Sequence, residues 1–594
     1  MRKNVLALSI AAMIGGFAGV AQASVIAAAG GAAATGAVLG TNVASEPLVV
    51  GAAAPLATTL AVNPNAIGHM LVVPYYTVQD GNMTVLHLSN TDRSSGKAVK
   101  IRFRGAANSD DVKDFQIYLS PGDIWTGAVV QGASGAATLY TSDNTCTVPA
   151  IPSTGTEFAT ARLNTVGNVN GTREGYVEIF NMADIPSVQL YNANGAAGAG
   201  TANSQLYTAI KHVSGTAPCS VAGSAARTTL DTLAMTNFTV AATAASKGFG
   251  ESTTGLSADW YILNLAQSTA FSGAATAIEA RTAGGVPGAA NFVHFPQTDA
   301  GSAAFFAGVG TAADSFTADP LLRTMYSDKS GVATTTGPVV TPLFIDLPDM
   351  STPYVTAADA IGNAPKLQAA ILTQALKRTS VSNQYALDAG ISAATDWVFS
   401  MPTRRYSVAA NYKAATTSAN NYVLFSDLDV VNTAYNAPVA GHGGADEWFT
   451  RANTRVDSRG NICVDASSMR FFDREETTTG AAPIFSPAVA GSLSFCGETS
   501  VLSFSASKVL GSSTDLTAMT MSTPYTNGWT VVSTPNSQTI VAGNLTNAAV
   551  GYAAGAANVG LPIIGNAFIK VNNNSAGAGF KSTFGITWAH RYNQ

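Results

Sequence analysis

Carboxylate side chains that could hold a metal ion gather in a short stretch of the first half of the chain. Asp110, Asp111 and Asp114 lie in a predicted loop, just before a strand that begins at Phe115. Carboxylate oxygens in such loops are ligands that Ca²⁺ prefers, and bound Ca²⁺ stiffens many extracellular proteins. These three aspartates are therefore a candidate Ca²⁺ site, and ordinary solvated turn residues are the alternative.

Three further acidic groups could do the same chemistry. They are Asp427 with Asp429, Asp446 with Glu447, and the run of Asp473, Glu475 and Glu476. A pair of carboxylates could also supply the acid and the nucleophile or base of a glycoside hydrolase. The spacing selects neither a catalytic pair nor one metal cluster, so both choices stay open, and Ca²⁺ is the only cofactor that the sequence suggests.

The cysteines favour covalent cross-links over metal binding. The chain has four of them, at Cys146, Cys219, Cys463 and Cys496. Among the pairings that four cysteines allow, the spacing favours Cys146–Cys219 in the first half and Cys463–Cys496 in the second. No C-x-x-C pair is present, and that argues against a zinc site. Disulfides persist in oxidising compartments, so these cysteines predict an exported protein.

Familiar catalytic motifs are absent from the sequence. It contains no G-x-S-x-G elbow, no H-E-x-x-H pair and no Walker loop. The histidines are scattered, and His87 alternates within a predicted strand, where a hydrogen-bonded sheet histidine is the expected role. The sequence therefore favours a protein that is not an enzyme.

The densest mixture of aromatic and charged residues runs from Asp396 to Arg405. Trp397 and a short strand are followed there by Arg404 and Arg405. The segment could be a ligand platform. The favoured interpretation is structural, with Trp397 in a core and the two arginines paired to carboxylates such as those of the 473–475 run.

Alternating hydrophobicity places most of these residues on short strands. Over 98–104, apolar residues alternate with Lys100, Arg102 and Arg104, which predicts a half-buried strand. Asp80-Gly81 between two β-rich runs predicts a hairpin. The sequence thus predicts a mainly β protein with two or more antiparallel β-sandwich (Ig-like) domains. One short helical insertion is expected around 356–378, with its helix over 365–378.

The start of the chain predicts export. Arg2 and Lys3 precede an apolar stretch, and Ala21-Gln-Ala23 follows it as a cleavage motif. The expected segments are a signal peptide at 1–23, an Ala/Gly-rich linker or arm at 24–63, an N-terminal β-sandwich domain at 64–300 and a C-terminal β-rich domain at 301–594. We expect a destination at the cell surface, in the outer envelope or outside the cell.

Charge is unusually sparse. Asp, Glu, Lys and Arg make up 11% of the chain, and residues 516–569 contain none of them. Because water-facing surfaces are normally kept soluble by charge, we expect this run to be hidden in a sheet stack or against a neighbouring subunit. The formal net charge of −5 argues against nucleic acid as a partner.

The last residues alternate most strictly. From Phe580 to Tyr592, mainly aromatic and aliphatic residues take every second position. A period of two predicts one long strand with a largely aromatic face.

Several phrases give the chain a family resemblance. The chain resembles surface-layer and other large secreted proteins of Gram-negative bacteria in its low charge, its many predicted strands and three short segments. The segments are Val73-Pro-Tyr-Tyr-Thr-Val, Leu119-Ser-Pro-Gly-Asp-Ile-Trp and Thr395-Asp-Trp-Val-Phe-Ser-Met-Pro-Thr. The resemblance implies a self-assembling coat, lattice or filament subunit, with copies of itself as partners and an envelope glycan or lipid as anchor. An outer-membrane β-barrel and a secreted carbohydrate-active enzyme or glycan-binding module are the alternatives.

Overall fold

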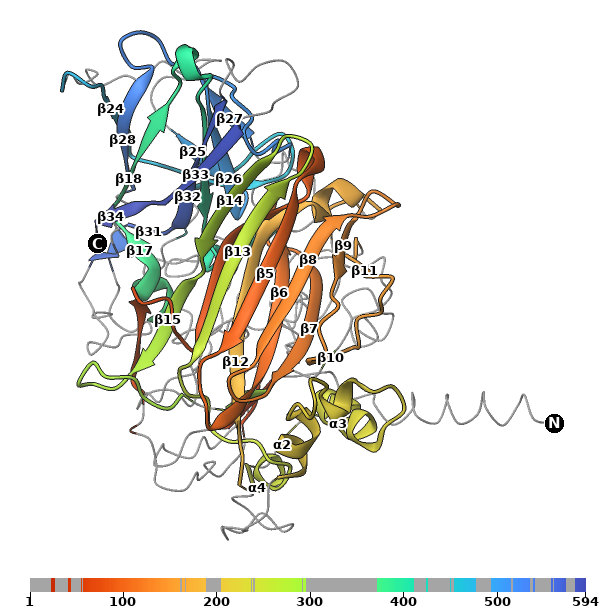
Figure 1. Cartoon of the computed structure of the whole chain (residues 1–594). Coiled ribbons are helices and arrows are strands. Elements are labelled where there is room, and N and C mark those ends of the chain that lie inside the picture. The colour runs from red at the N-terminus through yellow and green to blue at the C-terminus, as the bar shows by residue number, and fades with distance from the viewer. Residues whose placement is uncertain are drawn as a thin grey trace, which may run out of the picture.

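A computed structural model describes residues 23–26 and 41–43 and most of 55–297 and 371–593. Within the two long ranges the larger gaps are 189–203, 411–422, 426–448, 477–492, 540–556 and 573–582. Nearly all of the expected signal peptide, the boundary expected at 300–301 and the acidic pairs at 427–429 and 446–447 lie outside the described residues. The chain is mainly β, as predicted, and its strands form stacked, largely antiparallel sheets (Figure 1).

Two sheets form a sandwich in the N-terminal half. The seven-stranded sheet has the order β10 (Cys146–Val148), β7 (Asp111–Leu119), β6 (Ser95–Gly105), β12 (Glu174–Pro186), β4 (Met70–Thr77), β15 (Thr276–Arg281) and β3 (Thr59–Asn63). The six-stranded sheet has the order β11 (Thr156–Glu157), β9 (Ala137–Tyr140), β8 (Ile124–Gln131), β5 (Met83–Asn90), β13 (Leu256–Asn264) and β14 (Thr269–Ala274). Buried side chains from both sheets, Trp125 and Trp260 among them, fill the space between.

The C-terminal half contains a second sandwich. Its five-stranded sheet has the order β27 (Leu516–Met519), β26 (Thr499–Phe504), β19 (Ala394–Ser400), β32 (Ile564–Asn572) and β33 (Thr583–Ala589). Its four-stranded sheet has the order β24 (Ser468–Phe472), β28 (Asn527–Ser533), β18 (Ser380–Ala386) and β34 (Arg591–Asn593). Trp397, Phe471 and Phe504 lie in the core between these two sheets.

Smaller sheets complete the described fold. A three-stranded sheet joins β16 (Phe292–His294), β1 (Ala23–Ile26) and β2 (Thr41–Val43), and another joins β22 (Thr454–Val456), β23 (Ile462–Asp465) and β25 (Ser494–Cys496). The two-stranded pairs are β17 (Lys377–Arg378) with β31 (Leu561–Pro562), β20 (Val408–Ala410) with β21 (Val423–Phe425), and β29 (Gln538–Thr539) with β30 (Ala557–Asn558).

The turn at Asp80-Gly81 does not close the predicted hairpin. A short 3-10 turn, η1 (Gln79–Gly81), carries the left-handed φ of 51° at Asp80 and 75° at Gly81. However, β4 pairs with β12 and β15, whereas β5 pairs with β8 and β13. The turn therefore takes the chain from one sheet of the sandwich to the other. Both strands pair with other strands on both edges, so the local hairpin prediction was wrong.

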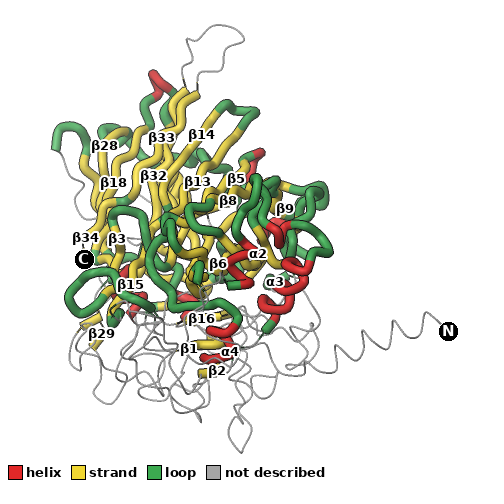
Figure 2. Tube along the Cα trace, turned by 60° about the horizontal axis from the view of Figure 1, so that its bottom comes forward, coloured by secondary structure: helices red, strands yellow, loops and turns green. Residues whose placement is uncertain are grey.

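Three short helices lie at one end of the N-terminal sandwich, and the sequence analysis did not foresee them. They are α2 (Gln205–Ile210), α3 (Ala225–Met235) and α4 (Ala241–Ser246), seen at the lower end in Figure 1 and as red segments in Figure 2. Ser204 and Ser224 cap α2 and α3 by accepting backbone hydrogen bonds, as serine commonly does. The low apolar periodicity of these Ala/Thr-rich segments hid them.

The expected helix over 365–378 is only partly as predicted. Its described part covers 371–376, and residues 356–370 lie outside the described residues. Lys377 and Arg378 were expected to end the helix, but they form β17 and pair with β31. None of the helices among the described residues combines the length and the apolar character that a membrane span requires.

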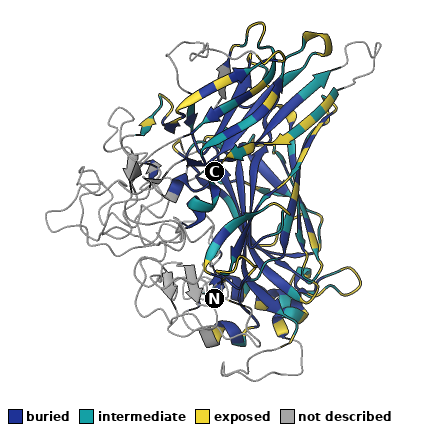
Figure 3. Ribbon diagram, turned by 90° about the vertical axis from the view of Figure 1, so that its left-hand side faces the viewer, coloured by how far each residue is buried: buried dark blue, intermediate teal, exposed yellow. Residues whose placement is uncertain are grey.

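The two halves share their hydrophobic interior. Helical residues Ile371, Leu372 and Leu376 belong to the same buried cluster as side chains of the seven-stranded sheet. Phe568 of β32 belongs to the core that contains Trp260 of β13. Figure 3 shows this buried zone running through both halves. Sites that join the halves are therefore held by packing on both sides.

Candidate functional site

A cluster of buried charges lies where the two halves meet. We call it the junction cluster: Arg104 of β6, Glu178 of β12, Arg404 and Arg405 of the 3-10 turn η7 (Arg404–Tyr406), and Glu498. None of these five side chains is more than 1% exposed. Burying a charge is costly unless it is paired, so the partners in this cluster decide whether the halves fit together.

Glu178 is the centre of the junction cluster. Its carboxylate accepts a hydrogen bond from Arg104 Nε at 3.0 Å, within the N-terminal half. Arg405 Nη2, from the C-terminal half, lies 3.3 Å from both carboxylate oxygens. One buried carboxylate thus pairs with a cation from each half.

Backbone and amide contacts surround the junction cluster. The Asn108 amide donates to the Gly460 carbonyl at 3.1 Å and accepts from the Ile462 N–H at 3.2 Å. Thr499 N–H donates to the Ala106 carbonyl at 3.1 Å. These three hydrogen bonds join the two halves directly around the junction cluster.

Arg404 and Arg405 have the structural role that the sequence favoured, but with other partners. Trp397 is fully buried in the C-terminal core. Arg405 pairs with Glu178, and Arg404 Nε lies 3.5 Å from Glu498 Oε2. The expected partners in the 473–475 run were wrong, because the fold brings carboxylates of β12 and of the segment before β26 closer.

Burial raises the pKa of Glu498 to about 7, although Arg404 and Arg405 lower it. The neighbouring Glu178 raises it further by charge repulsion. The distance of 3.5 Å between Arg404 Nε and Glu498 Oε2 is longer than a charge-assisted hydrogen bond. The guanidiniums therefore offset only part of the desolvation cost of the charged Glu498 carboxylate. Glu498 therefore titrates near neutral pH in the folded protein.

This shift predicts a pH dependence of stability. The folded state holds the Glu498 proton up to about pH 7, whereas a glutamate in the unfolded chain releases it near its ordinary pKa of 4.5. The contribution of Glu498 to stability is thus complete below that value and is lost as the pH rises through about 7. We expect Glu498→Gln to remove this loss. Urea midpoints of both proteins between mildly acid and mildly alkaline pH would measure it, and parallel profiles would contradict it.

The three candidate Ca²⁺ ligands lie on or beside β7, next to buried cations. Asp114 Oδ2 is 3.1 Å from Lys100 Nζ, and its other oxygen accepts from the Gln297 amide at 2.6 Å. Asp111 lies 3.9 Å from Arg104 Nη1, and the Asp110 carbonyl accepts from Gly105 N–H. The structure thus pairs two of the three carboxylates with protein cations, and Ca²⁺ binding here stays a prediction.

The disulfides are those predicted. Cys146 of β10 bonds to Cys219 in the 3-10 turn η3 (Pro218–Ser220), which ties the helical end to the edge of the seven-stranded sheet. Cys463 of β23 bonds to Cys496, which lies directly opposite on β25. Two disulfides indicate an oxidising, extracytoplasmic compartment.

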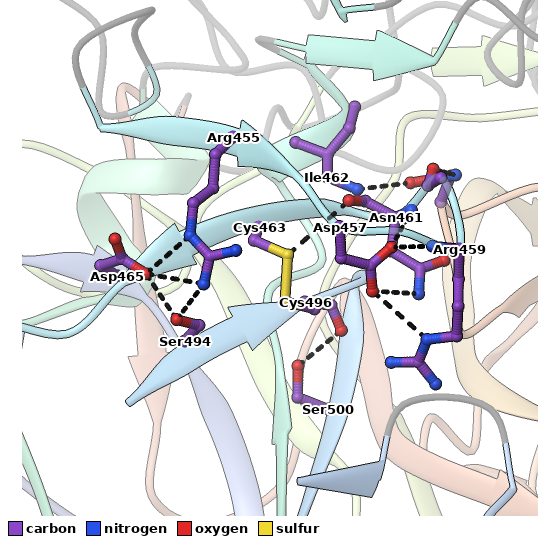
Figure 4. The surroundings of a disulfide bond; sticks show 12 residues. Arg455, Asp457, Arg459, Asn461, Ile462, Cys463, Asp465, Ser494, Cys496 and Ser500 are labelled. Carbon is purple, nitrogen blue, oxygen red and sulfur yellow. Dashed lines mark hydrogen bonds and ion pairs between the residues drawn. A yellow bond between two sulfur atoms is a disulfide. The ribbon is translucent and has the colours of Figure 1, made fainter. Parts of the chain in front are cut away.

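The Cys463–Cys496 bridge has a polar border, shown in Figure 4. Asp457 accepts hydrogen bonds from the Asn461 backbone and side chain. One of its carboxylate oxygens also lies within 4.8 Å of the two sulfur atoms. Metals bind thiolates, and these sulfurs are bonded to each other, so this group is a structural feature and not a metal site.

Two histidines, His87 of β5 and His590 between β33 and β34, are held by hydrogen bonds. His87 Nδ1 lies 2.8 Å from Thr126 Oγ1, consistent with the expected sheet role. His590 Nδ1 accepts a hydrogen bond from the Asn383 amide at 3.1 Å, and its Nε2 donates to the Val398 carbonyl at 2.9 Å. Burial lowers the pKa of His590 to about 3, so its ring is neutral at physiological pH. These two histidines therefore have a structural role in the sheets.

The final strand presents an exposed apolar stripe. It is formed by Phe584, Ile586 and Trp588 of β33, which we call the β33 stripe, and these side chains are 60%, 38% and 45% exposed. The predicted single strand is interrupted, because His590 is buried between β33 and β34. The aromatic face exists as predicted, and in this chain it faces solvent.

The opposite face of β33 is half-buried against β14. Thr587 Oγ1 accepts from Ser272 N–H of β14 at 3.3 Å, and no side chain larger than hydrogen fits at Gly585, where a Cβ would meet the Ala270 carbonyl at 2.0 Å. The N-terminal half thus packs on one face of β33 and fixes the strand. The β33 stripe is held outward on a rigid support.

Comparison with known proteins gives no relative. No family model, curated protein or solved structure matches this chain. The junction cluster can hold the halves together, and the β33 stripe can bind an apolar partner. In the described residues, no nucleophile, base and activating group come together in a way that specifies a reaction.

The uncharged run contributes to both the interior and the surface. Ile564 to Ile569 of β32 are buried in the five-stranded sheet, as expected for a hidden segment. Trp529 of β28 lies in the same run and is 45% exposed. The prediction therefore holds for β32 and not for the outer side of β28, and residues 540–556 lie outside the described residues.

Proposed function

We propose that this chain is a secreted structural protein of the cell surface that assembles with copies of itself into a coat, lattice or filament. The observation that carries the proposal is the β33 stripe. Large aromatic and aliphatic side chains on one strand face, exposed side by side, are typical of a protein-protein contact. A strand that is fixed from behind presents such a contact at low entropic cost.

The sparse charge of the chain supports the same proposal. A surface with few charges resists association poorly, because like-charge repulsion is what keeps many soluble proteins apart. Copies of one chain share this property, so a second copy is the partner that the composition favours. The two disulfides support a place outside the cytoplasm.

Assembly is expected to depend on the β33 stripe. Replacing Phe584, Ile586 and Trp588 by serine removes apolar area that would be buried in the contact. Each replacement is expected to raise the concentration needed for assembly by about tenfold. Sedimentation velocity and electron microscopy over a concentration series, with and without Ca²⁺, would measure this.

The matched control replaces exposed apolar residues elsewhere. Tyr261 and Leu265 of the six-stranded sheet and its following turn are 37% and 73% exposed, and their change to serine should leave assembly unaltered. A wild-type chain that stays monomeric throughout the series would refute the proposal. Equal assembly of the wild type and the stripe variant would refute the role of β33.

A further inference from the structure

The outer face of the four-stranded sheet carries an ordered set of exposed side chains. Alternation along β24, β28 and β18 turns Phe471, Val532 and Tyr385 into the core. The other positions point outward in two neighbouring rows that the register defines. One row is Phe472, Trp529 and Gln384, and the next is Arg470, Val531, Ser382 and Arg591. We call these two rows the platform face.

Trp529 is the aromatic centre of the platform face. Its ring stacks on that of Phe472, with centroids 4.1 Å apart and planes 8° from parallel. The tryptophan nevertheless stays 45% exposed. An aromatic ring that is fixed by a neighbour and open to solvent offers its negative π-face to the C–H groups of a flat ligand, such as a sugar ring. The platform is therefore organised before any ligand arrives.

Two guanidiniums flank the platform. Arg470 on β24 and Arg591 on β34 are both exposed and occupy the two ends of the second row. Three strand spacings separate them, about 14 Å. Within the described part of the chain, neither side chain forms an ion pair; the nearby Arg474 is paired with Asp388 at 3.6 Å. Arginine is suited to bidentate binding of carboxylates, so both ends of the row favour an anion.

Hydroxyl and amide groups complete the same face. Gln384 lies opposite Trp529 on β18 and is exposed. A third row beyond the arginines contains Ser468, Ser533, Ser380 and Asn593. The Asn593 amide donates to Ser380 Oγ at 2.9 Å. Such groups can donate hydrogen bonds to the hydroxyl groups of a sugar ring and accept hydrogen bonds from them.

We infer that the platform face binds an acidic polysaccharide, with a sugar ring on Trp529 and carboxylates on Arg470 and Arg591. The sugar ring matches the aromatic centre, the carboxylates match the cations, and a chain of sugars matches the length of the row. The inference takes its surface location from the proposed function and adds a ligand to it. It uses a different sheet and different residues from the β33 stripe.

Binding is tested with carboxylated polysaccharides of different ring geometry. Polygalacturonate, alginate and hyaluronate are immobilised, and methyl-esterified polygalacturonate and dextran serve as neutral counterparts. The wild type is expected to bind at least one charged polymer and to bind the neutral ones more weakly by about tenfold or more. Trp529→Ala should weaken binding by about tenfold. The double change Arg470→Gln with Arg591→Gln should weaken binding by about as much and should also reduce the salt dependence of binding.

Two matched variants separate this site from general effects. Tyr261 is an aromatic residue that is 37% exposed outside the platform face and the β33 stripe, and Arg459 is another exposed arginine. Tyr261→Ala and Arg459→Gln should bind the polysaccharide like the wild type. Circular dichroism and thermal melting of every variant confirm that it is folded.

The outcomes distinguish the inference from the proposed function. Loss of assembly in the β33 stripe variant with intact polysaccharide binding supports both. A wild-type protein that binds the polysaccharide but never assembles would refute only the proposed function. No binding to any charged polymer, equal binding by Trp529→Ala, or equally Trp529-dependent binding of single-stranded DNA overturns the inference.

Discussion

Replacing Glu178 by glutamine is expected to lower the free energy of unfolding by about 3–5 kcal/mol. Glutamine keeps the shape of the side chain and removes only its charge. Arg104 and Arg405 then lose the carboxylate that each contacts within 3.3 Å. Both guanidiniums stay buried, and a buried charge without its partner is far more costly than the pair was favourable.

The loss should affect the whole protein because Glu178 joins its halves. Arg104 belongs to β6, and Arg405 to η7 of the other half. Glu498 is the remaining carboxylate of the junction cluster, and it holds its proton up to about pH 7, so it does not replace the lost charge at mildly acid pH. Asp111, outside the cluster, lies 3.9 Å from Arg104 Nη1, farther than the 3.0 Å contact that Glu178 makes. Chemical denaturation monitored by far-ultraviolet circular dichroism would measure the change.

An exposed ion pair provides the control. Arg455 and Asp465 lie 3.3 Å apart with about half of each side chain exposed. Asp465→Asn should change the free energy of unfolding by less than about 1 kcal/mol, because water screens such pairs. If Glu178→Gln were no more destabilising than Asp465→Asn, the junction cluster would not hold the halves together.

The junction cluster shows where sequence patterns stop being informative. Lys100, Arg102 and Arg104 alternate with apolar residues, and this predicted a half-buried β6. In the structure these three side chains are at most 2% exposed, so β6 is buried on both faces. The pattern predicted the strand but not its burial on both faces, because the opposite charges come from β7 and β12. No local pattern can show such distant partners.

The cysteines and the last strand show the reverse case. Each disulfide joins cysteines within one half, so spacing alone sufficed to pair them. The period of two over the last residues predicted β33 and its aromatic face. It could not predict that β14 would pack against the other face and leave the β33 stripe in solvent, since exposure depends on the arrangement of whole sheets.

Phe568 is the residue whose loss should most directly separate the two hydrophobic interiors. Its ring lies 5.4 Å from Phe271, 5.9 Å from Trp260 and 6.3 Å from Tyr75. All three belong to the N-terminal half, whereas Phe568 lies on β32. Phe568→Ala is expected to lower the free energy of unfolding by about 3–5 kcal/mol, because the cavity cannot collapse between two fixed sheets.

The size of the effect can be assigned to packing with a graded variant. Phe568→Leu keeps much of the volume and should lower the free energy of unfolding by less than half as much. Amide hydrogen exchange at increasing denaturant concentration, followed separately for β13 and β19, reports the N-terminal and the C-terminal half. A shared core requires both signals to shift together to lower denaturant concentration. A shift confined to the signal of the C-terminal half would mean that the halves fold independently, and the contacts of Phe568 would then contribute little to joining them.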